Sequence, residues 1–171
     1  MPLRELINSL SLRKKLPQIE LAVTDEALAL VLRVLEKPTA DDEAKLRQFQ
    51  KDYGVDFWYQ PKGPDSIYPM DSENAARLKL HHRETGVEVV FRPTDFTQVN
   101  HRLNEVMVTR ALRLLHLEPS SKVIDFFCGL GNFTLPLATR TAKVLGIEGS
   151  SELVERARAG AKDNNLCLLY T

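Results

Sequence analysis

The stretch KVIDFFCGLGNFTLPLATRTAKVLGIE, residues 122–148, decides the fold of this chain. Its apolar residues Val123, Ile124 and Phe126 predict a short buried strand that ends at residues 125–127. Gly129 and Gly131 then allow a tight turn, because a residue without Cβ adopts left-handed backbone angles freely and lets a ligand approach. Asn132 opens the following helix, and a second strand at 143–147 ends in Glu148. The order strand, turn, helix, strand predicts a parallel α/β sheet.

The spacing of glycines and acids in this stretch indicates a nucleoside cofactor. Glu148 lies 23 residues after Asp125, at a strand end where nucleotide-binding α/β folds hold a ribose diol. The turn lacks the third glycine of a dinucleotide site and the Gly-Lys-Ser/Thr of a phosphate loop. A cofactor without a pyrophosphate fits better, and S-adenosylmethionine is the interpretation that we favour. The alternative is a βαβ unit whose tight turn is purely structural.

Composition places the chain among ordinary globular proteins without an overall bias toward nucleic acid. Of its 171 residues, 43% are hydrophobic and 27% are charged, and the formal net charge is zero. Any contact with RNA must therefore use local basic patches. The two cysteines are too few for a disulfide framework or a metal cluster. The sequence does not read as a signal peptide or a membrane span, so we expect a cytoplasmic protein without membrane contact.

The residues before the glycine turn predict a mixed α+β domain over residues 1–95. Alternating apolar residues predict paired strands at 19–24 and 27–35, followed by a helix at 39–53 and a strand at 55–59. Residues 78–83 and 87–92 flank a turn that contains glycine and predict a β-hairpin. Residues 96–171 are predicted to begin the α/β domain, with a helix from Asn100 to about residue 117. We expect this helix to pack on the sheet through an apolar face made of Leu103, Val106, Met107, Ala111, Leu114 and Leu115.

The first hairpin strand carries basic side chains at alternate positions. Arg77, Lys79, His81 and Arg83 share the face that the pattern predicts to be exposed. These side chains either contact RNA phosphates or form the charged outer face that hairpins commonly have.

Three motifs of this chain resemble those of a known enzyme family. They are DFFCGLGNFTLPLA at 125–138, GIEGS at 146–150 and DFTQVN at 95–100. Together they resemble the RNA uracil-5 methyltransferases, and most of all the bacterial branch that methylates 23S ribosomal RNA. The likeness is strong from Phe91 to Asn165 and weaker, in pattern only, from Ile19 to Met70. It implies a truncated Rossmann-like unit dependent on S-adenosylmethionine, preceded by the α+β domain, with ribosomal RNA as the partner.

The resemblance also implies roles for particular residues around the glycine turn. It assigns cofactor binding to Gln98, Asp125, Phe127, Gly129, Gly131, Asn132 and Glu148. Within this set, Asp125 and the two glycines shape the turn. Phe96 is expected to stack on the flipped target uracil. Ordinary alternatives are core packing for the two phenylalanines and a helix cap for Asn132.

The family's reaction, as the resemblance implies it, needs residues that we do not find in this chain. In that family a cysteine thiolate adds to C6 of uracil, C5 takes the methyl group, and a base removes the C5 proton. The resemblance implies that this cysteine and the glutamate base lie beyond Thr171. Cys128 sits inside the turn and Cys167 on a candidate buried strand, so we assign the nucleophile to neither. The family's four-cysteine iron–sulfur cluster cannot be placed on two cysteines. We therefore expect no metal site, and no activity from this chain alone.

The chain is therefore expected to be an internal fragment of a larger enzyme. It supplies two strands of a doubly wound sheet and the start of a third, at 166–170. Both full strands read as buried on both faces, yet one side of the first lacks a partner, and such an apolar edge recruits another chain. We expect self-association or a poorly ordered C-terminal region. Two other functions stay open: a methyltransferase of transfer RNA or small molecules, and a non-catalytic fragment that only binds a cofactor or partner.

Overall fold

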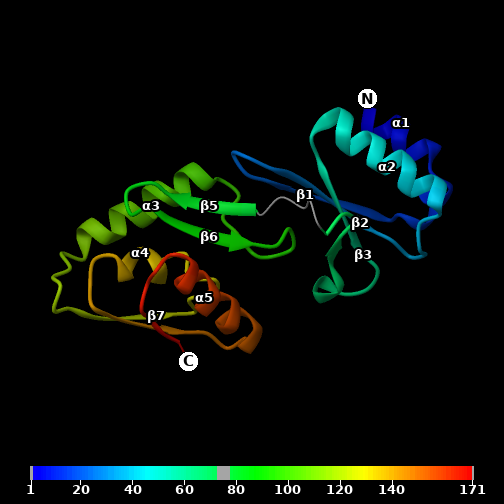
Figure 1. Ribbon diagram of the computed structural model, residues 1–171. Coiled ribbons are helices and arrows are strands. Elements are labelled where there is room, and N and C mark those ends of the chain that lie inside the picture. Colours follow the sequence, from blue (N-terminus) through cyan, green and yellow to red (C-terminus); the bar gives the residue numbers. More distant parts are fainter. Residues whose placement is uncertain (1, 73–77, 171) are drawn as a thin grey trace. The chain divides into compact units, whose positions relative to one another are not determined.

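The computed structural model describes residues 2–72 and 78–170 and divides into two compact units (Figure 1). The N-terminal unit combines the chain up to Leu78 with residues 92–96. The C-terminal unit combines residues 79–91 with residues 97–171. Each unit has its own sheet and its own apolar core.

A four-stranded sheet with strand order β1-β2-β3-β4 forms the N-terminal unit. Its strands are β1 (Gln18–Val23), β2 (Leu28–Arg33), β3 (Asp56–Gln60) and β4 (Tyr68–Pro69). β1 and β2 pair antiparallel, as the alternating pattern predicts. β2 and β3 run parallel, because helix α2 (Ala40–Tyr53) connects them as a crossover. The remaining elements are α1 (Pro2–Ser9) and two short 3₁₀ helices, η1 (Ser11–Lys15) and η2 (Pro64–Ser66).

The start of α2 is fixed by a buried acid. Thr39 and Asp42 form a reciprocal capping box, in which the Thr39 hydroxyl accepts from the Asp42 amide at 3.2 Å. The Asp42 carboxylate is fully buried and accepts the amide and the hydroxyl of Ser11, at 2.7 and 2.6 Å. Burial disfavours the charge, but the hydrogen bonds from Ser11 and Thr39 outweigh it, so the pKa of Asp42 is lowered. Asp42 therefore ties α2 to the segment that follows α1.

We expect Asp42→Ala to lower the free energy of unfolding by about 2–3 kcal/mol, because it removes a cap and leaves buried donors unpaired. The matched control is Asp41→Ala, one position earlier, whose exposed ion pair with Lys45 contributes little. Since the folded pKa of Asp42 is depressed, its contribution is present above the unfolded pKa and is lost as pH falls through the folded pKa. Urea unfolding at neutral and acidic pH measures both effects. Equal losses in the two variants would contradict this account.

A three-stranded parallel sheet with strand order β7-β8-β9 forms one layer of the C-terminal unit. Its strands are β7 (Lys122–Phe126), β8 (Lys143–Ile147) and β9 (Leu169–Tyr170). Helices α4 (Thr134–Ala138) and α5 (Ser151–Asp163) follow β7 and β8 and lie above the sheet in Figure 1. This arrangement confirms the predicted strand–turn–helix–strand unit and its Rossmann-like class. The short β9 agrees with the predicted start of a third strand.

The β-hairpin packs on the helices of the C-terminal unit. Its strands β5 (Leu78–His82) and β6 (Val87–Phe91) alternate buried and half-buried side chains, as the pattern predicts. β6 contacts both α4 and α5, and the two helices lie between the hairpin and the sheet (Figure 1). The predicted boundary after residue 95 placed this hairpin with the preceding residues. The contacts group it with the later chain instead, because its inward side chains pack on elements that follow residue 97.

Helix α3 (His101–Leu114) packs through a different face from the one that the sequence predicts. Asn104, Val108 and Leu112 are its buried residues, spaced four apart along one stripe. The expected face is wrong for four of its members, since Leu103, Val106, Leu114 and Leu115 are all more than half exposed. The helix has apolar residues on two faces, and the face that turns inward is the one on which Val108 and Leu112 enter the core and Asn104 finds a polar partner. Asn100 caps this helix as predicted, its side chain accepting from the Leu103 amide at 2.9 Å.

Strand β7 lies at one end of the sheet order and is exposed on one face. Ile124 and Phe126 are 55% and 63% exposed, whereas Val123 and Asp125 on the other face are half-buried. The expected edge is therefore present, but the expected burial of β7 on both faces is wrong. The reason is that α4 and α5 follow their strands over the same face of the sheet. Within the described residues, the sheet thus presents both an open strand edge and an apolar face.

Candidate functional site

The turn between β7 and α4 is built on left-handed backbone. Phe127, Gly129 and Gly131 have φ angles of 60°, 54° and 93°. The Cys128 amide donates to the Ile147 carbonyl at 3.1 Å, which holds the turn against the end of β8. The Gly131 amide donates to the Cys128 carbonyl at 2.8 Å and closes the turn. Glycine takes these angles without strain, which explains why the turn has glycine at positions 129 and 131. Phe127 adopts such an angle at a cost in backbone strain.

Glu148 lies beside this turn, directly after β8. Its Oε2 accepts the Gly129 amide at 3.1 Å, and its Oε1 accepts the Ser150 amide at 3.0 Å. A carboxylate offers about four lone pairs, so each oxygen retains one for a further donor. Glu148 is therefore oriented by the backbone and keeps the capacity to bind a pair of hydroxyl groups.

Asp125 is enclosed beneath the turn. Its Oδ2 accepts the hydroxyl of Thr134 at 2.5 Å, from the first residue of α4. Thr134 is fully buried, so the contact is shielded from water. Burial raises the pKa of Asp125, and the hydrogen bonds from Thr134 offset this only in part. Asp125 thus joins the end of β7 to the start of α4 and shapes the turn, as the resemblance implies.

We expect Asp125→Asn to raise the melting temperature at neutral pH, because the amide keeps an acceptor for Thr134 and removes a partly desolvated charge. The raised folded pKa means that the stabilising form is the protonated one. The stability that protonated Asp125 contributes is present below the unfolded pKa and is lost as pH rises through the folded pKa. The difference between variant and wild type should therefore shrink below about pH 4. Calorimetry across this range tests it, and a less stable variant at neutral pH would show that the ionised carboxylate stabilises the turn.

Asn132 faces inward instead of opening the helix. Helix α4 begins at Thr134, so the prediction that Asn132 opens it is wrong. The Asn132 side-chain amide pairs with that of Asn104 through two hydrogen bonds of 2.9 Å. His82 Nε2 lies 3.1 Å from Asn132 Oδ1. The turn is therefore tied to α3 and to the hairpin through this one side chain.

The remaining candidate residues are exposed. Phe127 is 91% exposed at the turn, and Phe96 is 88% exposed, so core packing explains neither. Gln98 lies exposed in the irregular segment before α3. The structure therefore brings Asp125, Gly129, Gly131, Asn132 and Glu148 together at the end of β7 and β8. Gln98 lies outside that cluster of contacts, and Phe96 belongs to the N-terminal unit.

A family model described as tRNA (Uracil-5-)-methyltransferase matches residues 3–169 of this chain. The chain belongs to this family. The match covers nearly all of the chain, including both compact units. It confirms the family to which the three sequence motifs pointed.

Similar proteins place the chain more closely within the uracil-5 methyltransferases. It is 52% identical over 165 residues to a 23S rRNA (uracil(1939)-C(5))-methyltransferase RlmD from Ralstonia pickettii. It is 54% identical over 168 residues to the protein of the same description from Cupriavidus necator. Each alignment covers 96% of this chain, but only 36% and 37% of those proteins. The chain thus spans little more than a third of the length of these relatives.

Solved structures share the fold. The Pyrococcus abyssi tRNA (uracil-54, C5)-methyltransferase, solved with S-adenosyl-L-homocysteine, matches with a TM-score of 0.62 and 18% identity. This match covers 86% of the present chain and 36% of that one. The M. jannaschii tRNA m1G37 methyltransferase matches with a TM-score of 0.51 and 15% identity, over 98% and 49% of the two chains. At these identities the likeness supports the methyltransferase fold.

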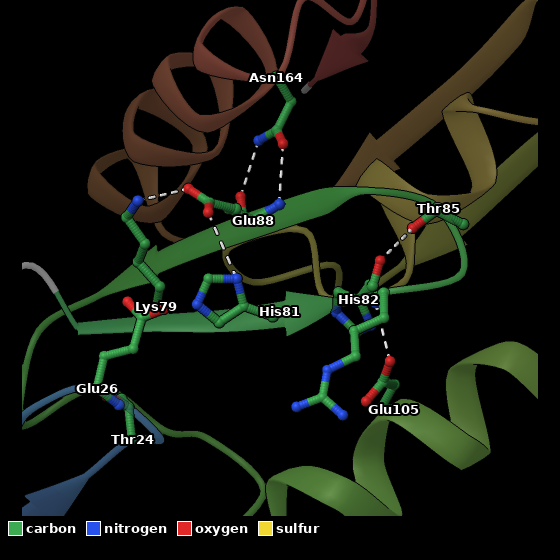
Figure 2. Close-up of polar contacts among 10 residues, drawn as sticks. Thr24, Glu26, Lys79, His81, His82, Thr85, Glu88, Glu105 and Asn164 are labelled. Carbon is green, nitrogen blue, oxygen red and sulfur yellow. Dashed lines mark hydrogen bonds and ion pairs between the residues drawn. The ribbon is translucent and has the colours of Figure 1, made fainter.

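The hairpin of this family member turns two of its basic residues, Lys79 and His81, onto its own acid Glu88. Figure 2 shows Lys79 and His81 directed at Glu88, with Lys79 Nζ 2.6 Å and His81 Nδ1 3.4 Å from its carboxylate. Asn164 binds the backbone amide and carbonyl of Glu88 from the end of α5, at 2.9 and 2.8 Å. Lys79 and His81 are therefore engaged within the protein, which favours the charged-face interpretation over phosphate contact. Arg77 lies outside the described residues.

The two cysteines differ in exposure. Cys128 is buried in the turn and Cys167 is exposed. Burial raises the pKa of the Cys128 thiol, and nearby Asp125 raises it further. A nucleophilic cysteine needs the opposite shift, because the thiolate is the reactive form. Cys128 is thus a structural residue of the turn.

Two further properties of the described ranges bear on the class of protein. Within residues 2–72 and 78–170, no helix has both the length and the hydrophobicity needed to cross a membrane. In the same ranges, no three histidine, cysteine or acidic side chains are close enough together to hold a metal ion.

Three polar neighbours of the turn escaped the sequence analysis: Asn104, Thr134 and His82. A signal for Asn104 was present, since a polar residue in line with Val108 and Leu112 interrupts an apolar helical stripe. Thr134 carried a weaker signal as a hydroxyl at the start of a helix, next to an acid-ended strand. His82 carried none, because its contact with Asn132 joins residues 50 positions apart.

Proposed function

We propose that this chain carries the first part of the S-adenosylmethionine site of an RNA uracil-5 methyltransferase that modifies 23S ribosomal RNA. The observation that carries the proposal is Glu148, held by two backbone amides beside the glycine turn with an open acceptor on each oxygen. S-adenosylmethionine, when bound, supplies the methyl group. A cytoplasmic location follows from this substrate.

The residues at the turn fit that cofactor. Glu148 would accept the two ribose hydroxyls in charge-assisted hydrogen bonds, which are stronger than neutral ones. Phe127, exposed at the turn, offers a flat apolar surface beside it. Gly129 has no atom within 4 Å of the place where a Cβ would stand, so its surface is open to a ligand. Asp125, Gly131 and Asn132 would support the turn from below.

The RNA class rests on sequence identity. The relatives that are 52–54% identical are described as acting on 23S ribosomal RNA. The solved enzyme described as acting on transfer RNA is 18% identical. Sequence identity therefore favours ribosomal RNA over the transfer-RNA alternative. Separately, Phe96 is proposed as the residue that stacks on the target uracil.

We assign neither the nucleophile nor the general base to residues 1–171. Cys128 is buried with a raised pKa, and Cys167 belongs to the segment before β9. We propose that residues 97–171, together with the hairpin of residues 79–91, begin the methyltransferase domain, that residues 1–78 and 92–96 form the α+β unit before it, and that this chain alone is inactive. The iron–sulfur cluster implied by the resemblance is proposed for the full-length family member and not for this chain.

We expect Gln98→Ala, made in a full-length protein that contains this chain, to lower methyl transfer at least tenfold while leaving the melting temperature unchanged. Methyl transfer should fall because the resemblance assigns Gln98 to cofactor binding. The melting temperature should not change because Gln98 is exposed in an irregular segment, so its loss removes no core packing. The control is Val99→Ala, its exposed neighbour in the same segment. A large fall in melting temperature with normal transfer would assign Gln98 a structural role.

A non-catalytic fragment is the competing function. The coding sequence beyond residue 171 distinguishes the two possibilities. A downstream Asn-Pro-x-Thr-type segment preceded by a cysteine would support the enzyme. A genuine stop codon after Thr171 would support a fragment that only binds a cofactor or partner.

A further inference from the structure

A buried polar cluster lies beneath the glycine turn, in a place that packing alone does not explain. It joins Asn132 of the turn, Asn104 of α3 and His82 of β5. Asn104 and His82 are each only 3% exposed. Burying such groups is costly unless they bind one another, and Asn104 interrupts a stripe that is otherwise apolar. A valine or leucine at these positions could not form the same hydrogen bonds, so the cluster points to a role beyond packing.

The directions of the hydrogen bonds make Asn132 the centre of this cluster. Its Nδ2 donates to Asn104 Oδ1, and its Oδ1 accepts from Asn104 Nδ2, both at 2.9 Å. Since an amide oxygen only accepts, His82 must carry its proton on Nε2 to bind the same Oδ1 at 3.1 Å. His82 Nδ1 is then a buried acceptor without a partner among the described residues. Burial also lowers the pKa of His82, consistent with a neutral ring that donates one hydrogen bond.

The cluster anchors one end of the turn, and β8 anchors the other. On the β8 side, the Cys128 amide binds the Ile147 carbonyl and the Gly129 amide binds Glu148. On the opposite side, the side chain of Asn132 is held by α3 and β5. A turn with two glycines has many accessible backbone states, so a fixed shape needs anchors at both ends.

We propose that Asn104 and His82 are positioning residues, which clasp Asn132 and thereby hold the glycine turn in the shape that binds the cofactor. The proposal rests on the function proposed above. It makes the hairpin and α3, which lie far from Glu148 in the sequence, part of the support of the cofactor site. The side chain of Asn132 points inward. Asn132 would therefore support the cofactor by holding the backbone of the turn in place.

The test uses a full-length protein that contains this chain, with three substitutions and one matched control. Asn104→Ala removes the paired amide, and His82→Met removes the donor while keeping volume. His82→Gln is the conservative variant, because its amide nitrogen lies where Nε2 was and can donate to Asn132. The control is Val108→Ala, one turn along the same buried stripe of α3 and 1% exposed, which loses packing without touching Asn132.

Two readouts are compared at a temperature where every variant is folded: hydrogen exchange of the segment 127–132, read by mass spectrometry, and the dissociation constant of S-adenosylhomocysteine. For Asn104→Ala and His82→Met we expect faster exchange and weaker binding, each by about tenfold or more, because the first variant loses two buried hydrogen bonds to Asn132 and the second loses one. We expect His82→Gln to stay near wild type. The control should lower the melting temperature without changing exchange in this segment.

An unchanged rate of hydrogen exchange in Asn104→Ala and His82→Met overturns the proposal. An equal rise of the exchange rate in Val108→Ala also overturns it, because the effect would then come from ordinary core packing. Failure of the proposed function looks different. If the wild-type protein does not bind S-adenosylhomocysteine, the cofactor assignment fails, while the exchange measurement still decides whether the clasp holds the turn.

Discussion

Replacing Glu148 by alanine should weaken binding of S-adenosylmethionine by about 2–3 kcal/mol, or roughly 30- to 150-fold, in a full-length protein that contains this chain. The reason is that the substitution removes both acceptors proposed for the ribose hydroxyls. It also frees the Gly129 and Ser150 amides that the carboxylate now binds. Titration calorimetry measures the change directly.

Two companion variants separate these effects. Glu148→Gln keeps one acceptor oxygen and loses the charge, so we expect an intermediate loss of affinity. Glu152→Ala, four residues later on the exposed surface of α5, should leave affinity unchanged. Affinity in Glu148→Ala equal to that of the control would remove Glu148 from the site.

Residues 1–171 on their own should self-associate through β7. The edge of this strand is open within the described residues, and Ile124 and Phe126 add an exposed apolar face. Burying a phenylalanine contributes about 1.5–3 kcal/mol. We therefore expect Phe126→Glu to raise the dissociation constant of the assembly on the order of 10- to 100-fold, as measured by sedimentation or light scattering.

The matched control for this substitution is Leu21→Glu. Leu21 is 62% exposed, close to the 63% of Phe126, and lies on β1 at the end of the other sheet. If association persists in Phe126→Glu and is lost in Leu21→Glu, the interface lies on the N-terminal unit. A monomer with poor protection of residues 122–148 is the alternative expectation of a poorly ordered C-terminal region. A monomer whose residues 122–148 exchange slowly would contradict both expectations.

Local signals in the sequence were sufficient for most elements and for the glycine turn with Glu148 beside it. Thr39 and Gly54 mark the ends of α2, where a capping box begins it and a left-handed glycine ends it. The alternation in β5 and β6 predicted the hairpin, and the glycines with Glu148 predicted the turn. In each case the deciding interactions join residues that are near one another in the chain or follow one repeated pattern.

The sequence does not determine which of two possible apolar faces of an element packs against the core. Helix α3 has apolar residues on two faces, and periodicity does not say which one turns inward. The inward face packs Val108 and Leu112 into the core and brings Asn104 to Asn132, and these contacts join distant elements. The hairpin likewise joined the C-terminal unit through Asn164 and Glu88, which lie 76 positions apart. Such pairs have no local pattern, so they emerge only with the fold.

We propose above all that this chain belongs to an enzyme that methylates C5 of a uridine in 23S ribosomal RNA. The most direct measurement incubates the full-length protein with labelled S-adenosylmethionine and separately purified 23S ribosomal RNA and transfer RNA, followed by nucleoside analysis. The account predicts labelled 5-methyluridine in the 23S RNA and none in the transfer RNA. Label confined to transfer RNA, or no labelled 5-methyluridine in either RNA, would contradict it.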